Sequence, residues 1–251
     1  MIFPIGDDNS DRTAAPVVNY LLIAINVLVF VFLQGMGTND RFTYAFSTVP
    51  EEIVTGHDID RPVVIQANGE RGTIDLQPTP GSVYLTLLTS MFMHGSLMHI
   101  FGNMLFLWIF GDNVENALGR IRYLIFYLVC GIIASLAHVF STVAFGGNPY
   151  IPSLGASGAI SGVLGAYLLL FPRRQVRVIM FRVLTTVPAI VAIGLWFLFQ
   201  LIEGYMNSGP QAGGGVAYAA HVGGFIAGLL LVKVFAIGRN NSSGNNLERA
   251  I

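Results

Sequence analysis

Residues 123–172 read YLIFYLVCGIIASLAHVFSTVAFGGNPYIPSLGASGAISGVLGAYLLLFP, a run without a single Asp, Glu, Lys or Arg. A membrane-spanning helix needs about 20 mostly apolar residues. This run is therefore too long for one helix and long enough for two. The turn sequence GGNP at 146–149, followed by Pro152, divides it. We predict one span over about 123–145 and the next over about 154–171.

Further apolar segments lie on both sides of this run. Residues 13–39 and 76–111 also lack charged side chains. Together these segments predict an all-α membrane protein with six transmembrane helices and both termini on one side. The other four spans are predicted over 17–33, over 91–110, between Arg182 and Glu203, and over about 215–237.

The composition agrees with this class. Apolar residues make up 53% of the chain and charged residues 11%, whereas soluble domains average about 25% charged residues. The net charge of −1 gives no reason to expect a nucleic-acid partner. The single cysteine, Cys130, cannot form an intramolecular disulfide or a cysteine-based metal site, and we expect neither a metal nor a cofactor. The acidic N-terminus is unlike a cleaved signal peptide.

Basic residues set the orientation. With the N-terminus inside, ten of the thirteen Lys and Arg residues lie on the cytoplasmic side, and the other three fall in a long polar loop over 36–80. We therefore predict a cytoplasmic tail over 1–16, a membrane domain over 17–237 with the 36–80 loop outside, and a flexible cytoplasmic tail over 238–251.

Three connecting segments carry further expectations. In the polar loop, two short β-rich runs at 63–66 and 72–76 predict a hairpin. Residues 82–98 are predicted to lie partly in the membrane interface before the second span. The glycine-rich segment 208–215 (SGPQAGGG) is expected to move together with the fifth span.

Several polar side chains lie within the apolar spans, where they are costly and usually face a protein interior or a cavity. They are His99 and Asn103 in the second span, Ser157 in the fourth and His221 in the sixth. These three spans run in the same direction, and His99, Ser157 and His221 each lie within about the first two turns after the outer end of their span, roughly 10 Å deep. We expect the groups to meet. His99 and Asn103, four residues apart, share a helix face.

Small residues surround Ser157 and His221. A serine at the start of a helix has free backbone N–H groups nearby, which can stabilise an oxyanion. A histidine within reach can take the serine proton and return it to a leaving amine. Tight packing of the fourth and sixth spans, which this chemistry needs, is predicted at Gly155, Gly158, Gly224 and Gly228.

Each of these residues also has an ordinary structural explanation. A serine in a membrane helix usually bonds back to a carbonyl one turn earlier. A histidine is more often an interhelical hydrogen bonder than a base, and glycines are common in membrane helices for packing alone. A transporter would more often carry an Asp, Glu or Arg deep in its spans. The residues alone therefore leave a hydrolase and a purely structural role open.

Four motifs in order resemble the rhomboid family of intramembrane serine proteases. They are HGSLMHIFGN at 94–103, GDNVENALG at 111–119, GASG at 155–158, and AHVGG at 220–224 with Gly228 following. The resemblance implies a six-helix rhomboid-like bundle with a polar outer loop between the first two helices. A water-filled cavity would open to the outside.

The resemblance, which covers about residues 84–232, also implies site residues and substrates. Ser157 and His221 would be a catalytic pair without an acidic third member. His99, Asn103 and the backbone N–H of Ser157 would form the oxyanion hole. Substrates would be single-span membrane proteins, cut near the outer face of a membrane that we expect to be a prokaryotic plasma membrane.

Two departures from the family pattern lie outside the catalytic set. Many relatives carry a Trp-Arg pair where this chain has Leu85 and Thr86, which leaves the anchoring of that loop open. Some bacterial relatives carry a tyrosine stacked on the catalytic histidine, where this chain has Ser161, so His221 must be oriented otherwise. We expect an active protease. The alternative is a non-proteolytic rhomboid-like membrane chaperone or quality-control binder.

Overall fold

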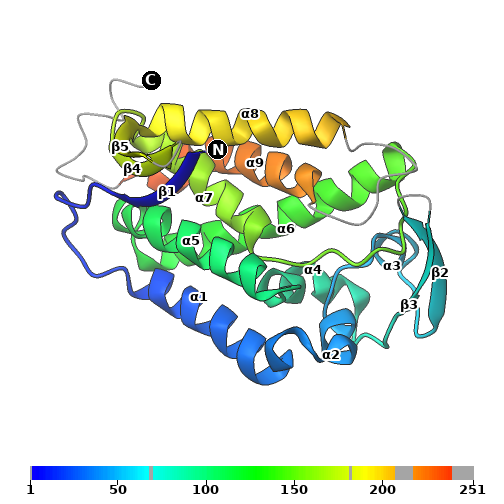
Figure 1. Cartoon of the computed structure of the whole chain (residues 1–251). Coiled ribbons are helices and arrows are strands. Elements are labelled where there is room, and N and C mark those ends of the chain that lie inside the picture. Colours follow the sequence, from blue (N-terminus) through cyan, green and yellow to red (C-terminus); the bar gives the residue numbers. More distant parts are fainter. Residues whose placement is uncertain (1, 68–69, 181–182, 207–216, 239–251) are drawn as a thin grey trace.

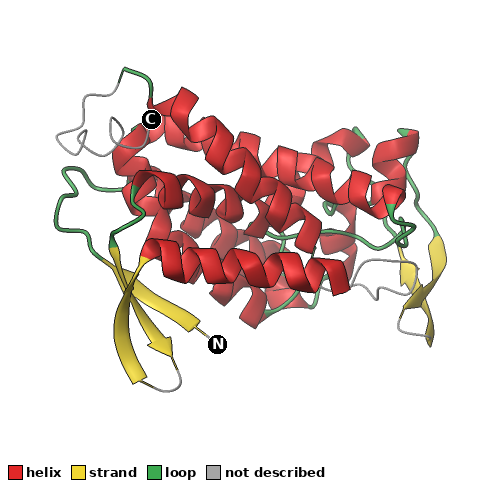
Figure 2. Cartoon of the chain, turned by 90° about the horizontal axis from the view of Figure 1, so that it is seen from above, coloured by secondary structure: helices red, strands yellow, loops and turns green. Residues whose placement is uncertain are grey.

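The computed structural model describes residues 2–67, 70–180, 183–206 and 217–238. Helices lie side by side, and small sheets stand at opposite ends of them (Figure 1, Figure 2). One sheet consists of β1 (Ile2–Asp7), β4 (Gln175–Met180) and β5 (Val183–Pro188), and we call its side of the molecule the sheet end. The other consists of β2 (Pro62–Ala67) and β3 (Glu70–Asp75), and we call its side the hairpin end. The longer helices are α1 (Val17–Leu28), α5 (Leu97–Leu118), α6 (Arg120–Ala144), α7 (Ser157–Leu170), α8 (Ala189–Met206) and α9 (Tyr218–Ala236).

Three of these helices, α6, α8 and α9, are long and apolar enough to cross a membrane by length and composition. A fourth candidate is the bent pair Val83–Phe92 and Leu97–Leu118, whose two parts meet at 79°. Shorter apolar helices, Val17–Leu33 and Ser157–Leu170, coincide with predicted spans. The described residues thus form a mostly helical protein with three or four candidate spans.

The chain between α1 and α5 folds at the hairpin end. Strands β2 (Pro62–Ala67) and β3 (Glu70–Asp75) pair antiparallel, which confirms the predicted hairpin. Thr48 joins this region to the bundle, because its N–H donates to the Ser153 carbonyl at 3.0 Å and its carbonyl accepts from the Ser153 N–H at 2.8 Å. The short helices here are η1 (Val29–Leu33), η2 (Gly35–Gly37), α2 (Asp40–Ala45), α3 (Pro50–Thr55), η3 (Val83–Leu85), α4 (Thr86–Thr89) and η4 (Ser90–Phe92).

The second predicted span, 91–110, begins later in the structure, at Leu97. Met93 is extended, with φ −90° and ψ 145°, which breaks the helical path. The side chain of Ser96 then accepts from the His99 N–H at 3.1 Å. A serine that satisfies one of the first free N–H groups in this way fixes the start of a helix.

The fifth predicted span, placed between Arg182 and Glu203, also begins later. Residues 183–188 (VLTTVP) form strand β5 (Val183–Pro188), and α8 starts at Ala189. β-branched residues favour the extended backbone, which accounts for the strand. The predicted starting point, Arg182, lies outside the described residues, as do the 208–215 segment and the predicted tail beyond residue 238.

The predicted tail over 1–16 contains a strand. β1 (Ile2–Asp7) pairs antiparallel with β4 (Gln175–Met180), which pairs with β5. Val176 and Val178 of β4 are fully buried, so one face of this sheet packs on the bundle. Strand β1 was not predicted, because its six residues include Pro4 and Gly6 and show no clear alternation of apolar and polar residues.

The start of α8 is fixed at the sheet end by backbone hydrogen bonds. The Ala189 N–H donates to the Arg174 carbonyl at 2.8 Å, and the Ile190 N–H donates to the Pro172 carbonyl at 3.0 Å. Arg174 and Pro172 lie in the turn that follows α7. The sheet-end terminus of α8 is therefore tied to the end of α7 and to strand β4.

Buried polar contacts hold the rest of the sheet end together. A carboxylate oxygen of Asp7 in β1 accepts from the Tyr167 hydroxyl at 2.6 Å and from the Asn113 amide at 2.7 Å. Glu115 of α5 accepts from two backbone N–H groups at the start of α1, at 3.1 and 2.7 Å. A carboxylate at this position accepts hydrogen bonds from the free N–H groups and is stabilised by the positive end of the helix dipole.

Candidate active site

Helices α7 and α9 contact each other through glycine backbones. A Cβ atom added at Gly224 would lie 2.1 Å from the carbonyl oxygen of Gly158, and one added at Gly228 would lie 2.0 Å from that of Gly162. Only glycine permits such an approach. The contact places Ser157, the first residue of α7, beside the first turn of α9.

Gly155 has a different role from the other glycines of the predicted packing set. It lies ahead of α7 with φ 125°, a left-handed conformation that favours glycine. A Cβ atom there would lie 2.8 Å from Nε2 of His99. Gly155 therefore makes room for the His99 ring rather than for another helix.

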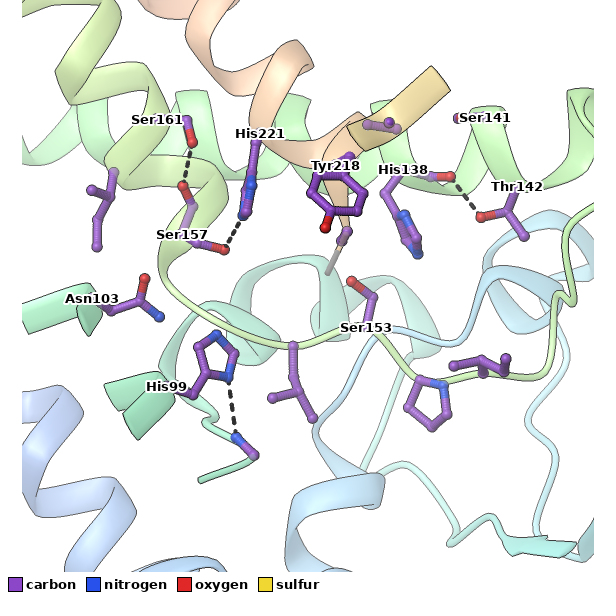
Figure 3. A pocket seen from close by; sticks show the side chains of 18 of the residues that line it. His99, Asn103, His138, Ser141, Thr142, Ser153, Ser157, Ser161, Tyr218 and His221 are labelled. Carbon is purple, nitrogen blue, oxygen red and sulfur yellow. Dashed lines mark hydrogen bonds between the residues drawn. The ribbon is translucent and has the colours of Figure 1, made fainter. Parts of the chain in front are cut away.

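Ser157 and His221 form a hydrogen-bonded pair. The Ser157 Oγ lies 2.8 Å from the His221 Nε2, and His221 is buried (Figure 3). The other ring nitrogen, Nδ1, lies 2.6 Å from Oε1 of Gln200 on α8. An amide oxygen only accepts, so Nδ1 carries the ring proton and Nε2 is left to accept from the serine hydroxyl.

Two further polar groups from α5 point toward the space beside Ser157 (Figure 3). The side-chain Nδ2 of Asn103 is buried and has no hydrogen-bond partner among the described residues. His99 accepts from the Gly95 N–H at its Nδ1, at 3.3 Å, so its neutral ring carries the proton on Nε2. The backbone N–H of Ser157 lies at the start of α7, where helical N–H groups have no partner within the helix.

These groups line a cavity of about 840 Å³ between α5, α6, α7, α8 and α9. The cavity has no Asp, Glu, Lys or Arg among the described residues that line it. His138 of α6 also lines it, as do Trp196 and Tyr218. The geometry places a serine, a histidine and several hydrogen-bond donors around one space large enough for a segment of polypeptide.

Sequence reasoning missed Gln200 and Trp196. Both lie in α8, four residues apart and thus on one helix face. The Trp196 ring centre lies 6.0 Å from that of His221. A signal was present, because Gln200 is a polar residue in an otherwise apolar span. It was missed because the polar groups considered lay only in spans that run in the same direction.

The fold and the site define an integral membrane bundle of helices with a serine–histidine pair at a cavity. Comparison with known proteins gives the family. A family model described as Rhomboid domain matches residues 81–237. The chain belongs to the rhomboid family.

Three relatives illustrate the similarity. Rhomboid protease GluP of Bacillus subtilis (strain 168) is 30% identical over 243 residues, which cover 96% of this chain and 39% of the relative. Rhomboid protein 1, mitochondrial, of Saccharomyces cerevisiae is 33% identical over 58% of this chain and 40% of its own length. The human presenilin-associated rhomboid-like protein, mitochondrial, is 34% identical over 58% of this chain and 36% of its own length. This chain thus spans about two fifths of the length of these curated relatives.

Proposed function

We propose that this chain is an intramembrane serine endopeptidase that cleaves transmembrane segments of single-span membrane proteins near the outer membrane face. The observation that carries the proposal is the 2.8 Å contact between Ser157 Oγ and His221 Nε2 at the cavity. Membership of the rhomboid family and the similarity to a relative named as a protease support it.

In the proposed acylation step, His221 Nε2 takes the hydroxyl proton as Ser157 Oγ attacks the scissile carbonyl carbon. The carbonyl oxygen becomes an oxyanion, which accepts hydrogen bonds from Asn103, His99 and the Ser157 backbone N–H. The unpartnered Nδ2 of Asn103 favours this role, because a buried amide donor without a partner is costly until a ligand supplies one. The tetrahedral intermediate then collapses: the C–N bond breaks as His221 gives its proton to the leaving amine, and the acyl group stays on Ser157 Oγ as an ester.

Deacylation repeats the same proton transfers with water. A water molecule from the cavity gives a proton to His221 Nε2 and attacks the acyl-enzyme carbonyl. The second tetrahedral intermediate collapses, the ester bond to Ser157 Oγ breaks, and the serine oxygen takes the proton back. No acidic side chain is needed in these steps, in agreement with the cavity lining.

The proposed topology has six spans within a membrane domain over 17–237, and the hairpin end faces the outside. The 36–80 loop then lies outside, and the tails over 1–16 and 238–251 lie in the cytoplasm of a prokaryotic cell. Small, helix-weakening residues at the cleavage site are favoured, because a helical backbone hides its carbonyl groups. Movement of α8 would admit the substrate, and a crosslink from α8 to α5 that leaves cleavage normal would refute that movement.

The test is cleavage by the purified protein reconstituted with model single-span substrates. Wild type should cleave near the outer face, and Ser157→Ala should lose that activity. Ser135→Ala is the matched control, because Ser135 of α6 does not line the cavity, and it should behave as wild type. Cleavage by Ser157→Ala would refute the mechanism. Binding without cleavage by wild type across several substrates would favour the chaperone or quality-control alternative.

A further inference from the structure

We propose that Gln200 of α8 is the positioning residue of the Ser157–His221 pair. Its side-chain oxygen holds His221 in the orientation that accepts the serine proton, and it makes that orientation depend on where α8 lies. The proposal rests on the protease function proposed above. It gives the pair a neutral third member from a helix in which the sequence indicated no site residue.

The contact between Gln200 and His221 is short and enclosed. The Gln200 Oε1 lies 2.6 Å from His221 Nδ1, and the two side chains are 5% and 8% exposed. Because the amide oxygen has no proton to give, only the tautomer with a proton on Nδ1 satisfies both groups. The opposite tautomer would face the Gln200 oxygen with a lone pair and would present an N–H to Ser157. With its amide oxygen toward His221, as in the structure, Gln200 selects the tautomer that can act as a base.

The two ring nitrogens are the fixed points of the imidazole. Nε2 lies 2.8 Å from Ser157 Oγ, and Nδ1 lies 2.6 Å from Gln200. Two aromatic rings also lie near the imidazole, with centroid distances of 6.0 Å for Trp196 and 6.5 Å for Tyr218, but aromatic packing does not direct a ring nitrogen toward the serine. Loss of the Gln200 contact would leave the ring with one described hydrogen bond, to Ser157. Two hydrogen bonds on opposite edges, in contrast, define its rotation.

Gln200 also links the site to a weakly anchored helix. The other buried residues described in α8, Ala189, Ala192 and Ile193, lie near the sheet end. Gln200 is the buried residue of its other half. A displacement of that half away from α9 would separate Gln200 from His221 while Ser157 stays in place, because Ser157 belongs to α7. The alignment of the pair is therefore coupled to the closure of α8.

The acceptor at this position is uncharged, which has a measurable consequence. The titratable groups that surround His221 are His99 on α5, His138 on α6 and Tyr218 on α9. Glu203 of α8 interacts electrostatically with Tyr218. No described carboxylate lines the cavity. A carboxylate introduced at position 200 would stabilise the imidazolium form of His221. At a given pH, a larger fraction of His221 would then be protonated. The neutral imidazole, which acts as the base, would form only at higher pH.

The test uses the full-length protein in detergent and in vesicles, with Gln200→Leu, Gln200→Glu and the control Phe199→Leu. Phe199 is the neighbouring α8 residue, 49% exposed and outside the cavity lining. Three quantities are measured: the rate of Ser157 labelling by a small fluorophosphonate, kcat and KM for a single-span substrate, and the pH profile. The small probe reports on the pair without requiring a substrate helix to enter past α8.

For Gln200→Leu we expect kcat and the labelling rate to fall roughly 10- to 100-fold with KM little changed, since removal of a group that orients a functional histidine commonly has this effect. Gln200→Glu should recover most of the labelling rate, and the acidic limb of its pH profile should move up by roughly one unit. Phe199→Leu should match wild type.

Equal labelling of Gln200→Leu and wild type would overturn the proposal, and so would a change confined to KM. If Gln200→Leu does not fold, as judged by its melting temperature and gel filtration, Gln200→Glu decides alone. An unshifted pH profile in that variant then overturns the proposal. A wild-type protein that neither cleaves nor reacts would refute the protease function itself, which is a different outcome from equality between wild type and variant.

Discussion

The α7–α9 pair and helix α8 are packed in opposite ways. Glycines bring the backbones of α7 and α9 into close contact at Gly158 and Gly224 and again at Gly162 and Gly228, and these two helices carry Ser157 and His221. In contrast, α8 buries few of its described residues, and most of these lie near its fixed start at the sheet end. The difference in packing fits the proposal that the α7–α9 pair aligns the reacting groups, whereas α8 controls access to them.

The first test of this contrast adds one methyl group to each region by replacing a glycine with alanine, once in α9 and once in α8. In Gly228→Ala, the new methyl would lie 2.0 Å from the carbonyl oxygen of Gly162, so α7 and α9 must separate. We expect a loss of about 1–3 kcal/mol in the free energy of unfolding and a loss of most cleavage activity. Thermal melting and a cleavage assay measure the two effects.

The matched control is Gly194→Ala in α8. A Cβ atom there meets nothing within 4 Å among the described residues, so stability and cleavage should stay near the wild-type values. If both substitutions had equal effects, the proposed difference in packing between the two regions would be wrong.

A smaller effect on activity is expected where α8 contacts α9 through aromatic rings. Phe197 stacks on Phe225 with a centroid distance of 4.1 Å and an interplanar angle of 18°. Removal of the stack in Phe197→Ala should cost about 0.5–1.5 kcal/mol beyond the lost area, while fluorophosphonate labelling of Ser157 persists. Labelling that disappears in a folded Phe197→Ala protein would show that α8 supports the pair more broadly than through Gln200.

The smallest effect concerns the sheet end, where backbone hydrogen bonds connect the start of α8 to the turn after α7. Burial raises the pKa of Asp7 to about 7, although hydrogen bonds from Tyr167 and Asn113 oppose the shift. The folded state then binds more protons than the unfolded state between about pH 4 and 7, so stability falls as the pH rises through this range. We expect wild type to lose more melting temperature than Asp7→Asn between pH 5 and pH 8. Parallel curves would contradict the assignment.

The sequence alone led to much of the candidate site. Ser157, His221, His99 and Asn103 could be predicted to meet, because a polar side chain in an apolar span has few places to point. Gln200 was not predicted, because its span runs in the opposite direction; its polar side chain among apolar neighbours was the available signal. Strand β1 was also missed, because its pairing partner lies more than 160 residues away along the chain and only tertiary contact selects it.

Both α5 and α8 begin later than the predicted spans, for a similar reason. An absence of charges marks where a chain can enter a membrane, but it does not mark where a helix begins. The start of α5 depends on one side-chain cap, Ser96, and the start of α8 depends on backbone bonds to the turn after α7. Both are local contacts that a count of apolar residues does not register.

The most direct measurement is identification of the residue that a fluorophosphonate modifies in the reconstituted protein, by mass spectrometry of the labelled chain. We predict one adduct, on Ser157, that is absent from Ser157→Ala and strongly reduced in His221→Ala, because the serine depends on its histidine for activation. An adduct at another serine, or undiminished labelling of Ser157 in His221→Ala, would contradict the proposed pair.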